Sequence, residues 1–335
     1  PDSITVATAL KACTSIEALK EGMEIHKYVY ICGMELDRFA ASTLIDFYGR
    51  CGELENAYNV FNKIPHKDVV CWNSMVSVFV KHECAERAFK LFTRMMAVEG
   101  VKADEATFTC VLKACAYLGD GERGKCVHNL VIESGVHLNT EVGNTMLDMY
   151  AKCNSLHDAC TMFKRLEKHD LVTWNAMIAG CSLNVKPEDV YQLYAQMQQE
   201  GAMPNEATYT SVLDVCTSSS EGKRVHAHIM GMPLGIGIIA GAALLNMYGK
   251  CGSLDEVHHY FKEIIHRDVV SWNTMISIFA KKGMNKQALQ LYEDMRKEGI
   301  VSDKVTFLSI LSTFMTEVEL EEGKRVHKHI TFVGL

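Results

Sequence analysis

Apolar residues recur along this chain with the spacing of an amphipathic helix. Trp72, Met75, Val76 and Phe79 are spaced i, i+3, i+4, i+7, which places them on one helical face. After a polar turn, the same spacing returns over residues 88–95. A glycine follows the second apolar run, which is typical of a left-handed helix C-cap. The pattern therefore predicts a pair of helices joined by a turn.

This helical hairpin is repeated. The string Trp-Asn-x-Met occurs three times, starting at Trp72, Trp174 and Trp272. Two other strings return at nearly the same interval: they are Tyr-x-x-Cys at 48–51, 150–153 and 248–251, and Gly-x-x-x-His ending at His26, His128, His226 and His327. Each interval is long enough for three related hairpins. Such repetition predicts a solenoid, in which neighbouring units stack into one continuous core.

Equivalent points along the chain define ten units that alternate in length between 31 and 36 residues where they are complete. The expected units are 3–37, 38–68, 69–104, 105–139, 140–170, 171–205, 206–237, 238–268, 269–303 and 304–335. The unit 206–237 is shortened. The chain opens with Pro1-Asp2, which resembles the end of an earlier unit, and the unit 304–335 is incomplete, so we expect both ends of the chain to interrupt a repeat. With five prolines and no long Ser/Gly tract, residues 1–335 are expected to form one all-α array.

Composition narrows the possible partners. The chain has 335 residues, 48% of them hydrophobic, and a formal net charge of -7. An acidic balance disfavours indiscriminate binding to polyanions, so any nucleic-acid surface must be local. No window approaches the roughly 18 unbroken apolar residues of a membrane span, and no membrane contact is expected.

Most of the thirteen cysteines are interpreted as reduced, buried side chains rather than disulfide partners. Several of them recur in frame within the apolar stripes. One slot is shared by Cys51, Cys153 and Cys251, and another by Cys13, Cys115 and Cys216. A slot that returns once per interval is more simply a packing position than half of a bridge.

The strings Trp-Asn-x-Met, Met-Tyr-x-Lys-Cys and Glu-Gly-Lys-Arg-Val-His, in units of about 35, 31 and 35 residues, resemble the pentatricopeptide repeat (PPR) family of plant organelles, specifically its PLS subclass. The resemblance implies a right-handed superhelix of tetratricopeptide-like hairpins. It assigns L motifs at 3–37, 105–139, 206–237 and 304–335, S motifs at 38–68, 140–170 and 238–268, and P motifs at 69–104, 171–205 and 269–303. Tetratricopeptide repeats keep one length near 34 residues, so the alternation disfavours them.

Members of this family read single-stranded RNA one base per repeat. The resemblance assigns base choice to the fifth and last residues of each motif, and we expect the last residue to lie beside the fifth residue of the next unit. The implied pairs are Ser42 with Asp68, Asn73 with Asp104, Asn144 with Asp170, Asn175 with Asn205, and Asn273 with Asp303. Ser with Asp resembles a guanine reader, Asn with Asp a uracil reader, and Asn with Asn a pyrimidine reader.

Two features leave this readout incomplete. Ala242 is the fifth residue of the motif that ends at Asp268, and its side chain cannot form a hydrogen bond. The L motifs follow the code poorly. From Ser42 onward the implied register is G-U-x-U-Y-x-x-U, where Y is a pyrimidine and x is open.

Two further slots are expected to contact RNA. The thirteenth position of the S and P motifs carries cations that could meet phosphates, although a solvated helix end would explain them too. These cations are Arg50, Lys81, Lys152, Lys250 and Lys281, and Leu183 breaks the series. The second position carries residues expected to flank the bases: Phe39, Val70, Val172, Ile239 and Val270. Glu141 occupies this slot in one S motif and weakens the interpretation there.

No catalytic chemistry is expected in this chain. A cytidine deaminase domain needs a His-x-Glu and a Cys-x-x-Cys zinc site, and neither string occurs. His26, His128, His226 and His327 occupy equivalent slots in different units, so they cannot converge on a metal and are interpreted as structural. The tryptophans are interpreted as core residues. We expect no zinc and no cofactor.

The expected function is binding of a single-stranded transcript in a mitochondrion or chloroplast, which positions it for C-to-U editing or other processing by a C-terminal domain or partner outside this chain. L motifs could contact editing cofactor proteins or a deaminase-bearing partner. The alternative is a protein-protein scaffold, for which exchanging Asn73 or Asn175 would leave binding intact. An RNA-processing enzyme ranks last, because no acid-base or metal cluster is evident.

Overall fold

The computed structural model describes residues 3–31, 38–98, 100–136, 138–231, 237–264 and 267–313, together with 324 and 326. Every regular element in these ranges is an α-helix, and they contain no strand. The chain divides into two compact units, Pro1–Asn184 and Val185–Leu335, which are described separately. The expected all-α fold is confirmed. His327 and most of the region 304–335 beyond residue 313 lie outside the described residues.

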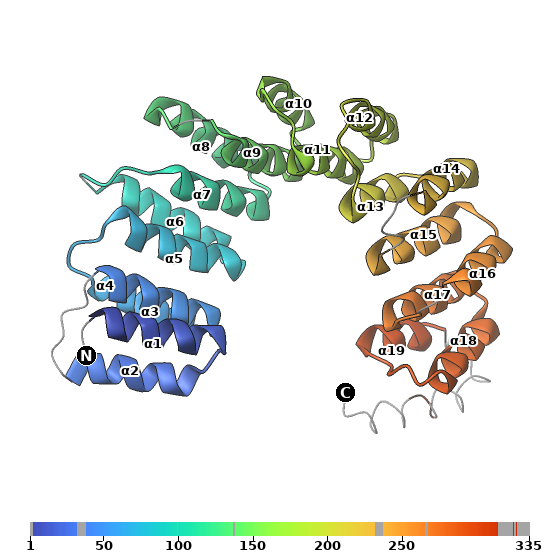
Figure 1. Ribbon diagram of the computed structural model, residues 1–335, viewed down its shortest axis with the longest axis horizontal. Coiled ribbons are helices and arrows are strands. Elements are labelled where there is room, and N and C mark those ends of the chain that lie inside the picture. Colours follow the sequence, from blue (N-terminus) through green and yellow to red (C-terminus); the bar gives the residue numbers. More distant parts are fainter. Residues whose placement is uncertain are drawn as a thin grey trace. The chain divides into compact units, whose positions relative to one another are not determined.

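The first unit contains α1 to α11 (Figure 1). Their bounds are α1 Ser3–Ser15, α2 Leu19–Ile31, α3 Arg38–Arg50, α4 Leu54–Lys63, α5 Val69–Lys81, α6 Ala85–Met96, α7 Glu105–Leu118, α8 Gly121–Ser134, α9 Thr140–Lys152, α10 Leu156–Arg165 and α11 Leu171–Leu183. Consecutive odd-numbered helices pack side by side, from α1 against α3 to α9 against α11. Each even-numbered helix packs against the odd-numbered helices on either side of it in the chain.

The second unit repeats this arrangement with α12 to α19. Their bounds are α12 Pro187–Gln199, α13 Glu206–Asp214, α14 Ser219–Met230, α15 Ile238–Cys251, α16 Leu254–Glu263, α17 Val269–Lys281, α18 Asn285–Lys297 and α19 Lys304–Leu311. Here α13, α15, α17 and α19 form the row of neighbouring helices. In both units every odd-numbered helix begins at the residue that opens an expected repeat, so each repeat starts with its first helix.

The apolar stripe found in the sequence is the core of each hairpin. Trp72, Met75, Val76 and Phe79 of α5 are all buried, and the Trp72 ring lies edge-on to Phe61 of α4. The turn glycines behave as expected too, because Gly100, Gly201 and Gly299 have φ values of 84°, 78° and 77°. The periodic pattern therefore located both the helices and the faces that they bury.

The cysteine slot at Cys13, Cys115 and Cys216 is a packing position, because all three side chains are buried. All twelve described cysteines are free thiols. Burial raises the pKa of Cys115 to about 12, which disfavours the reactive thiolate at neutral pH. No helix in the described ranges has both the length and the apolar character needed to cross a bilayer.

The recurring Gly-x-x-x-His strings lie in the second helix of the units 3–37, 105–139 and 206–237 and contact the first helix of the following unit. A Cβ atom on Gly22, Gly124 or Gly222 would overlap Phe47, Met149 or Met247 of the next helix, so the helices approach closely there and a larger residue would force that side chain to shift. One turn later, a histidine Nδ1 hydrogen-bonds a tyrosine hydroxyl. The three pairs are His26 with Tyr48 at 2.8 Å, His128 with Tyr150 at 2.7 Å, and His226 with Tyr248 at 2.9 Å. These histidines are structural, as the sequence indicated.

These histidines should make the protein less stable in mild acid. Burial lowers the pKa of His26, His128 and His226 in the folded state, with a nearby Lys63 adding to the effect at His26 and Arg165 at His128. Below about pH 6.5 the unfolded chain therefore binds protons more readily than the folded chain. We expect the free energy of unfolding to be level above that pH and to fall as pH decreases below it.

Urea unfolding at pH 7.5, 6.5 and 5.5 would measure this decline. A variant with glutamine at His26, His128 and His226 should lose part of the pH dependence over the same window. An unchanged pH profile in that variant would contradict the assignment.

Candidate functional site

One face of the first helices presents the residues expected to contact a ligand. In α5, Val70, Asn73 and Lys81 are three and then eight residues apart, so they lie along one face of the helix. Val70 at the second position is 53% exposed although it is apolar, and Lys81 is exposed at the helix end. The other apolar second-position residues are also exposed: Phe39, Val172, Ile239 and Val270. These side chains are available to an external partner rather than to the core.

Asn73 lies at the centre of a compact hydrogen-bonded group. Its Nδ2 donates to Asp104 Oδ1 at 2.9 Å, and Thr107 Oγ1 donates to Asn73 Oδ1 at 2.6 Å. Asp104 is the N-cap of α7, where Oδ1 accepts the Thr107 backbone N–H at 2.9 Å and Thr107 Oγ1 accepts the Asp104 N–H at 3.2 Å. The capping box thus fixes the carboxylate, and the carboxylate fixes the amide of the neighbouring helix.

The same group recurs in the second unit and, in altered form, elsewhere in the first. Asn273 Nδ2 donates to Asp303 Oδ1 at 2.9 Å, and Thr306 Oγ1 donates to Asn273 Oδ1 at 2.6 Å. In the first unit, Asn144 Nδ2 donates to Asp170 Oδ1 at a longer 3.2 Å. Three of the expected residue pairs are therefore brought into hydrogen-bonding contact.

One geometric expectation was wrong. We expected the last residue of a unit to lie beside the fifth residue of the next unit, but these hydrogen bonds join the fifth and last residues of the same unit. The reason is that the last residue caps the following odd-numbered helix, which packs beside the helix that carries the fifth residue.

The aspartates in these groups are held ionised. Burial alone would raise the pKa of Asp104, but hydrogen bonds from the Thr107 backbone, Asn73 and the Thr107 hydroxyl outweigh it, and the net pKa is lowered. The pKa values of Asp170 and Asp303 are lowered for the same reasons. Each carboxylate is therefore an acceptor at neutral pH, which requires the NH₂ end of the asparagine to face it.

The remaining expected base-contacting residues are placed as follows. Ser42 donates its hydroxyl to the Phe39 carbonyl at 3.1 Å, and Asp68 caps α5 through the Cys71 N–H at 3.0 Å. Asp268 caps α17 in the same way, while its partner position holds the buried methyl group of Ala242.

Asn175 and Asn205 fall in different compact units, so each is described only within its own unit. Asn175 lies in α11 and is partly buried, while Asn205 caps α13 through the Thr208 N–H at 3.1 Å.

The expected phosphate-contacting cations are exposed, but they differ in their surroundings. Lys152 Nζ lies 2.8 Å from Asp148, and Lys250 Nζ lies 3.9 Å from Asp214. Exposed ion pairs of this kind are worth about 0–1 kcal/mol, so a phosphate could displace either carboxylate. Arg50, Lys81 and Lys281 end α3, α5 and α17, where cations also complement the helix dipole.

Sequence reasoning missed the third-position hydroxyls of Thr107 and Thr306. The capping-box pattern of Asp or Asn followed three residues later by Thr was available as a signal, and it occurs at Asp104, Asp170, Asn205 and Asp303. It would have predicted the caps. It could not have predicted the bond from Thr107 to Asn73, which joins residues 34 positions apart.

Comparison with known proteins gives the family. The model of the PPR repeat family matches 67–116, 169–218 and 267–316, and a second PPR repeat model matches 39–69, 144–171 and 243–269. Together these matches span more than half of the chain. The chain belongs to the pentatricopeptide repeat family.

Curated PPR relatives match nearly the whole chain. A chloroplastic pentatricopeptide repeat-containing protein of Arabidopsis thaliana is 36% identical, with 96% of this chain and 40% of the relative covered. A mitochondrial one from the same plant is 33% identical, with 90% and 48% covered. The chain spans about half the length of the curated relatives it matches.

Solved structures share the fold. The pentatricopeptide repeat protein PPR10 in complex with an 18-nt psaJ RNA element matches with a TM-score of 0.75 at 20% identity, covering 97% of this chain and 50% of PPR10. Yeast Rmd9p in complex with a 16-nt target RNA matches with a TM-score of 0.58 at 11% identity, covering 95% and 77%. These likenesses establish that the helical hairpins stack as in a PPR solenoid.

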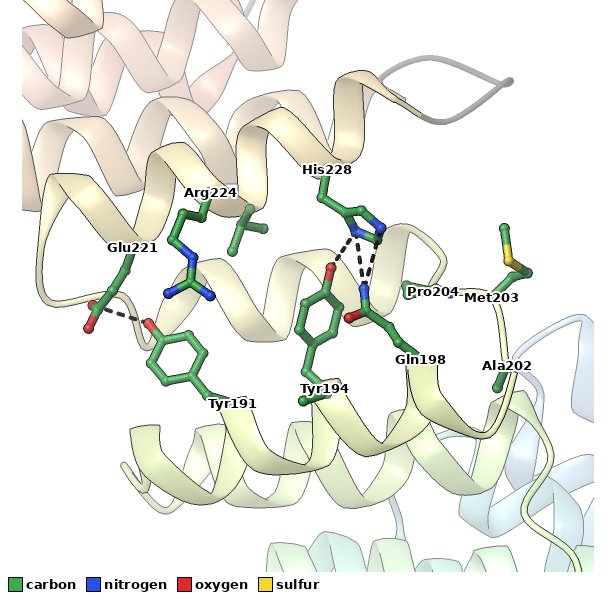
Figure 2. Close-up of a pocket in the computed structure, with 12 residues that line it drawn as sticks. Tyr191, Tyr194, Gln198, Ala202, Met203, Pro204, Glu221, Arg224 and His228 are labelled. Carbon is green, nitrogen blue, oxygen red and sulfur yellow. Dashed lines mark hydrogen bonds between the residues drawn. The ribbon is translucent and has the colours of Figure 1, made fainter.

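A separate cavity lies within the second unit, between α12 and α14 of this PPR array (Figure 2). It measures about 660 Å³, and Tyr191, Tyr194 and Arg224 are among its lining residues. The Tyr194 hydroxyl hydrogen-bonds His228 Nδ1 at 2.6 Å, and the Arg224 side chain extends into the space between the helices. In the described ranges, no three His, Cys, Asp or Glu side chains are grouped so that they could hold a metal ion.

Proposed function

We propose that this chain binds a specific single-stranded RNA through the exposed face of its odd-numbered helices, reading one base per repeat. The observation that carries the proposal is the repeated Asn-Asp group at Asn73/Asp104 and Asn273/Asp303, in which two hydrogen bonds hold each amide in one orientation. Fixed donors and acceptors are what a base edge requires for discrimination. Exposed apolar residues one turn earlier, such as Val70 and Val270, supply surfaces that can flank the bases.

The relatives support this function. PPR10 is solved with an 18-nt RNA element and Rmd9p with a 16-nt target RNA. Several curated relatives are named chloroplastic or mitochondrial, which supports an organellar transcript as the ligand. The alternating unit lengths support the L, S and P assignment and hence an RNA-editing role of the PLS type. In that role the chain selects the transcript, and a domain or partner outside it performs C-to-U editing or another processing step.

The test is binding of this chain to RNA oligonucleotides that carry the register G-U-x-U-Y-x-x-U, at one fixed salt concentration. In this register the Ser42/Asp68 unit reads the first base, Asn73/Asp104 the second, Asn144/Asp170 the fourth, and Asn273/Asp303 the eighth. Exchanging the first, second or eighth base should weaken binding by about 1 to 3 kcal/mol, or roughly 5- to 150-fold. Exchanging an open position is the matched control and should change affinity little. Equal affinity for all of these oligonucleotides would contradict sequence-specific recognition.

A second candidate function, a protein-binding scaffold, is favoured by the cavity between α12 and α14 (Figure 2). The residues that line this cavity differ from those at the equivalent place in the first unit. Tyr191 replaces Phe89, His228 replaces Leu130, and Glu221 replaces Arg123. In the first unit Arg123 pairs with Glu86 at 2.7 Å, and Cys126 occupies the place of Arg224. No ion pair of Arg224 is found within the described residues, and its side chain lines the cavity. An acidic segment of an editing partner would complement Arg224.

This second function makes an opposite mutational prediction. Arg224→Glu should abolish co-purification of the chain with organellar editing proteins, while Asn73→Ala should leave it intact. If the chain has both functions, Asn73→Ala should weaken RNA binding and Arg224→Glu should leave it unchanged.

A further inference from the structure

We propose that Thr107 and Thr306 are positioning residues that set the orientation of the Asn73 and Asn273 amides, and thereby decide whether the site accepts uracil or cytosine. This inference rests on the proposed RNA-binding function and deepens it. It concerns residues at the third position of the following repeat, outside the fifth- and last-residue pairs assigned to base choice.

The two ends of an asparagine amide have nearly the same shape but opposite hydrogen-bonding character. Unless its partners differ, the amide can rotate by half a turn at little cost. At Asn73 the partners do differ, because the ionised Asp104 carboxylate only accepts and lies 2.9 Å from Nδ2. On the other side, Thr107 Oγ1 lies 2.6 Å from Asn73 Oδ1. Thr107 Oγ1 also lies 2.8 Å from Asp104 Oδ1, as in the other capping boxes. The contact with Asn73 Oδ1 is the shorter of the two, so we place the hydroxyl hydrogen there, and both ends of the amide then have a partner of opposite polarity.

The Thr107 hydroxyl is well placed to hold this orientation. Thr107 is completely buried, and its Oγ1 also accepts the Asp104 backbone N–H at 3.2 Å, which aims the hydroxyl hydrogen away from that N–H. The same array recurs at Thr306, which is also completely buried, with Oγ1 2.6 Å from Asn273 Oδ1 and 3.0 Å from Asp303 Oδ1. Recurrence in two compact units indicates a feature of the repeat rather than a local accident.

The orientation of the amide matters because uracil and cytosine differ in whether this part of the base edge accepts or donates a hydrogen bond. Uracil presents a carbonyl acceptor at the position where cytosine presents an amino donor. With Nδ2 anchored on Asp104, the remaining N–H of Asn73 is a donor, which suits the uracil carbonyl. A rotated amide would present an acceptor instead and suit cytosine.

The chain contains its own contrasting case at Asn144. Thr173 Oγ1 donates to Asp170 Oδ1 at 2.9 Å and accepts the Asp170 N–H at 3.2 Å, so it completes the same capping box. Asn144 Oδ1, however, is buried and has no hydrogen-bond partner within the described part of the chain. Thr173 therefore supports the helix cap without holding Asn144 Oδ1, and this amide is oriented by Asp170 alone. Thr173 is the matched control for Thr107.

The experiment compares Thr107→Val, Thr107→Ser and Thr173→Val with the unmodified chain. Affinities are measured for the G-U-x-U-Y-x-x-U oligonucleotide and for versions with cytosine at the second or fourth base. Thr107→Val should reduce the uracil-over-cytosine ratio at the second base roughly three- to tenfold, the value of one lost hydrogen bond, and leave the fourth base unchanged. Thr107→Ser keeps the hydroxyl and should keep the uracil-over-cytosine ratio. Serine is compatible with this position, because Ser271 Oγ donates to the capping residue Asp268 Oδ1 at 2.7 Å. Thr173→Val should leave the ratio at the fourth base unchanged.

The outcomes separate this inference from the proposed function. If the unmodified chain shows no base preference at the second position, the proposed function fails and the inference fails with it. If it prefers uracil and Thr107→Val keeps the full ratio, only the inference is overturned. An equal loss from Thr173→Val at the fourth base would also overturn it, because capping alone would then explain the effect. Thr306→Val, read at the eighth base, repeats the test in the second compact unit if Thr107→Val does not fold.

Discussion

Replacing Trp174 by alanine should lower the free energy of unfolding by about 3 to 5 kcal/mol. The Trp174 side chain is 0% exposed and packs edge-on against Phe163 of α10, with ring centroids 5.1 Å apart, and against His169 at 5.3 Å. Removing the indole would leave a cavity at the junction of α10 and α11, where neighbouring repeats stack. Because each repeat is stabilised mainly by its neighbours, the loss should weaken the adjacent hairpins as well. Urea unfolding followed by circular dichroism would measure it.

Two variants serve as controls for Trp174→Ala. Trp174→Phe keeps most of the ring and removes an indole N–H that is buried without a partner in the described part of the chain, so it should cost clearly less than alanine. Tyr117→Ala removes an aromatic ring that is 58% exposed and should change stability by no more than about 0.5 kcal/mol. If Trp174→Ala unfolds at the same urea concentration as the unmodified chain, the core assignment is wrong.

The repeat pattern was enough to predict the helices and their buried faces. Trp72 and Trp174 follow from periodicity alone, since residues spaced i, i+3, i+4, i+7 share a face whatever the fold around them. Gly22 and His26 could be recognised only as recurring slots. Their physical reason, a close helix crossing followed by a hydrogen bond to Tyr48, depends on which helices become neighbours.

The candidate site was predictable at the level of which residues pair, and less so at the level of atoms. The repeat register paired Asn73 with Asp104 for base choice, and the two are in contact. The contact lies within one unit, whereas we had expected the last residue beside the fifth residue of the next unit. The contribution of Thr107 was not foreseen, because a capping residue is a local feature, whereas its bond to Asn73 crosses from one helix to the next. The difference between Thr107 and Thr173 is finer still. Both threonines complete the same Asp-x-x-Thr capping box, so the sequence pattern does not distinguish them. Only the structure shows that Thr107 contacts Asn73 Oδ1, whereas Asn144 Oδ1 is buried and unpartnered within the described residues.

The largest functional effect should come from changing a single base-contacting residue. Asn73→Ser would convert the Asn73/Asp104 pair into the combination found at Ser42/Asp68, so we expect the preferred second base to change from uracil to guanine. The affinity ratio between the two oligonucleotides should reverse, with each preference worth about 1 to 3 kcal/mol. Asn144→Ser is the matched variant, and it should shift only the fourth base. Competition binding between paired oligonucleotides measures both changes.

Asp104→Asn tests the other half of the pair without disturbing the fold. Asn205 shows that asparagine caps a first helix of this chain, because its Oδ1 accepts the Thr208 N–H at 3.1 Å. The substitution should therefore preserve stability but relax the second base from uracil to either pyrimidine. Asp104→Ala should in addition cost about 1 kcal/mol of stability through the lost cap. If Asp104→Asn and Asn73→Ser both retain the original uracil preference, base choice resides elsewhere, and the exposed face of the odd-numbered helices would be a docking surface rather than a reader of sequence.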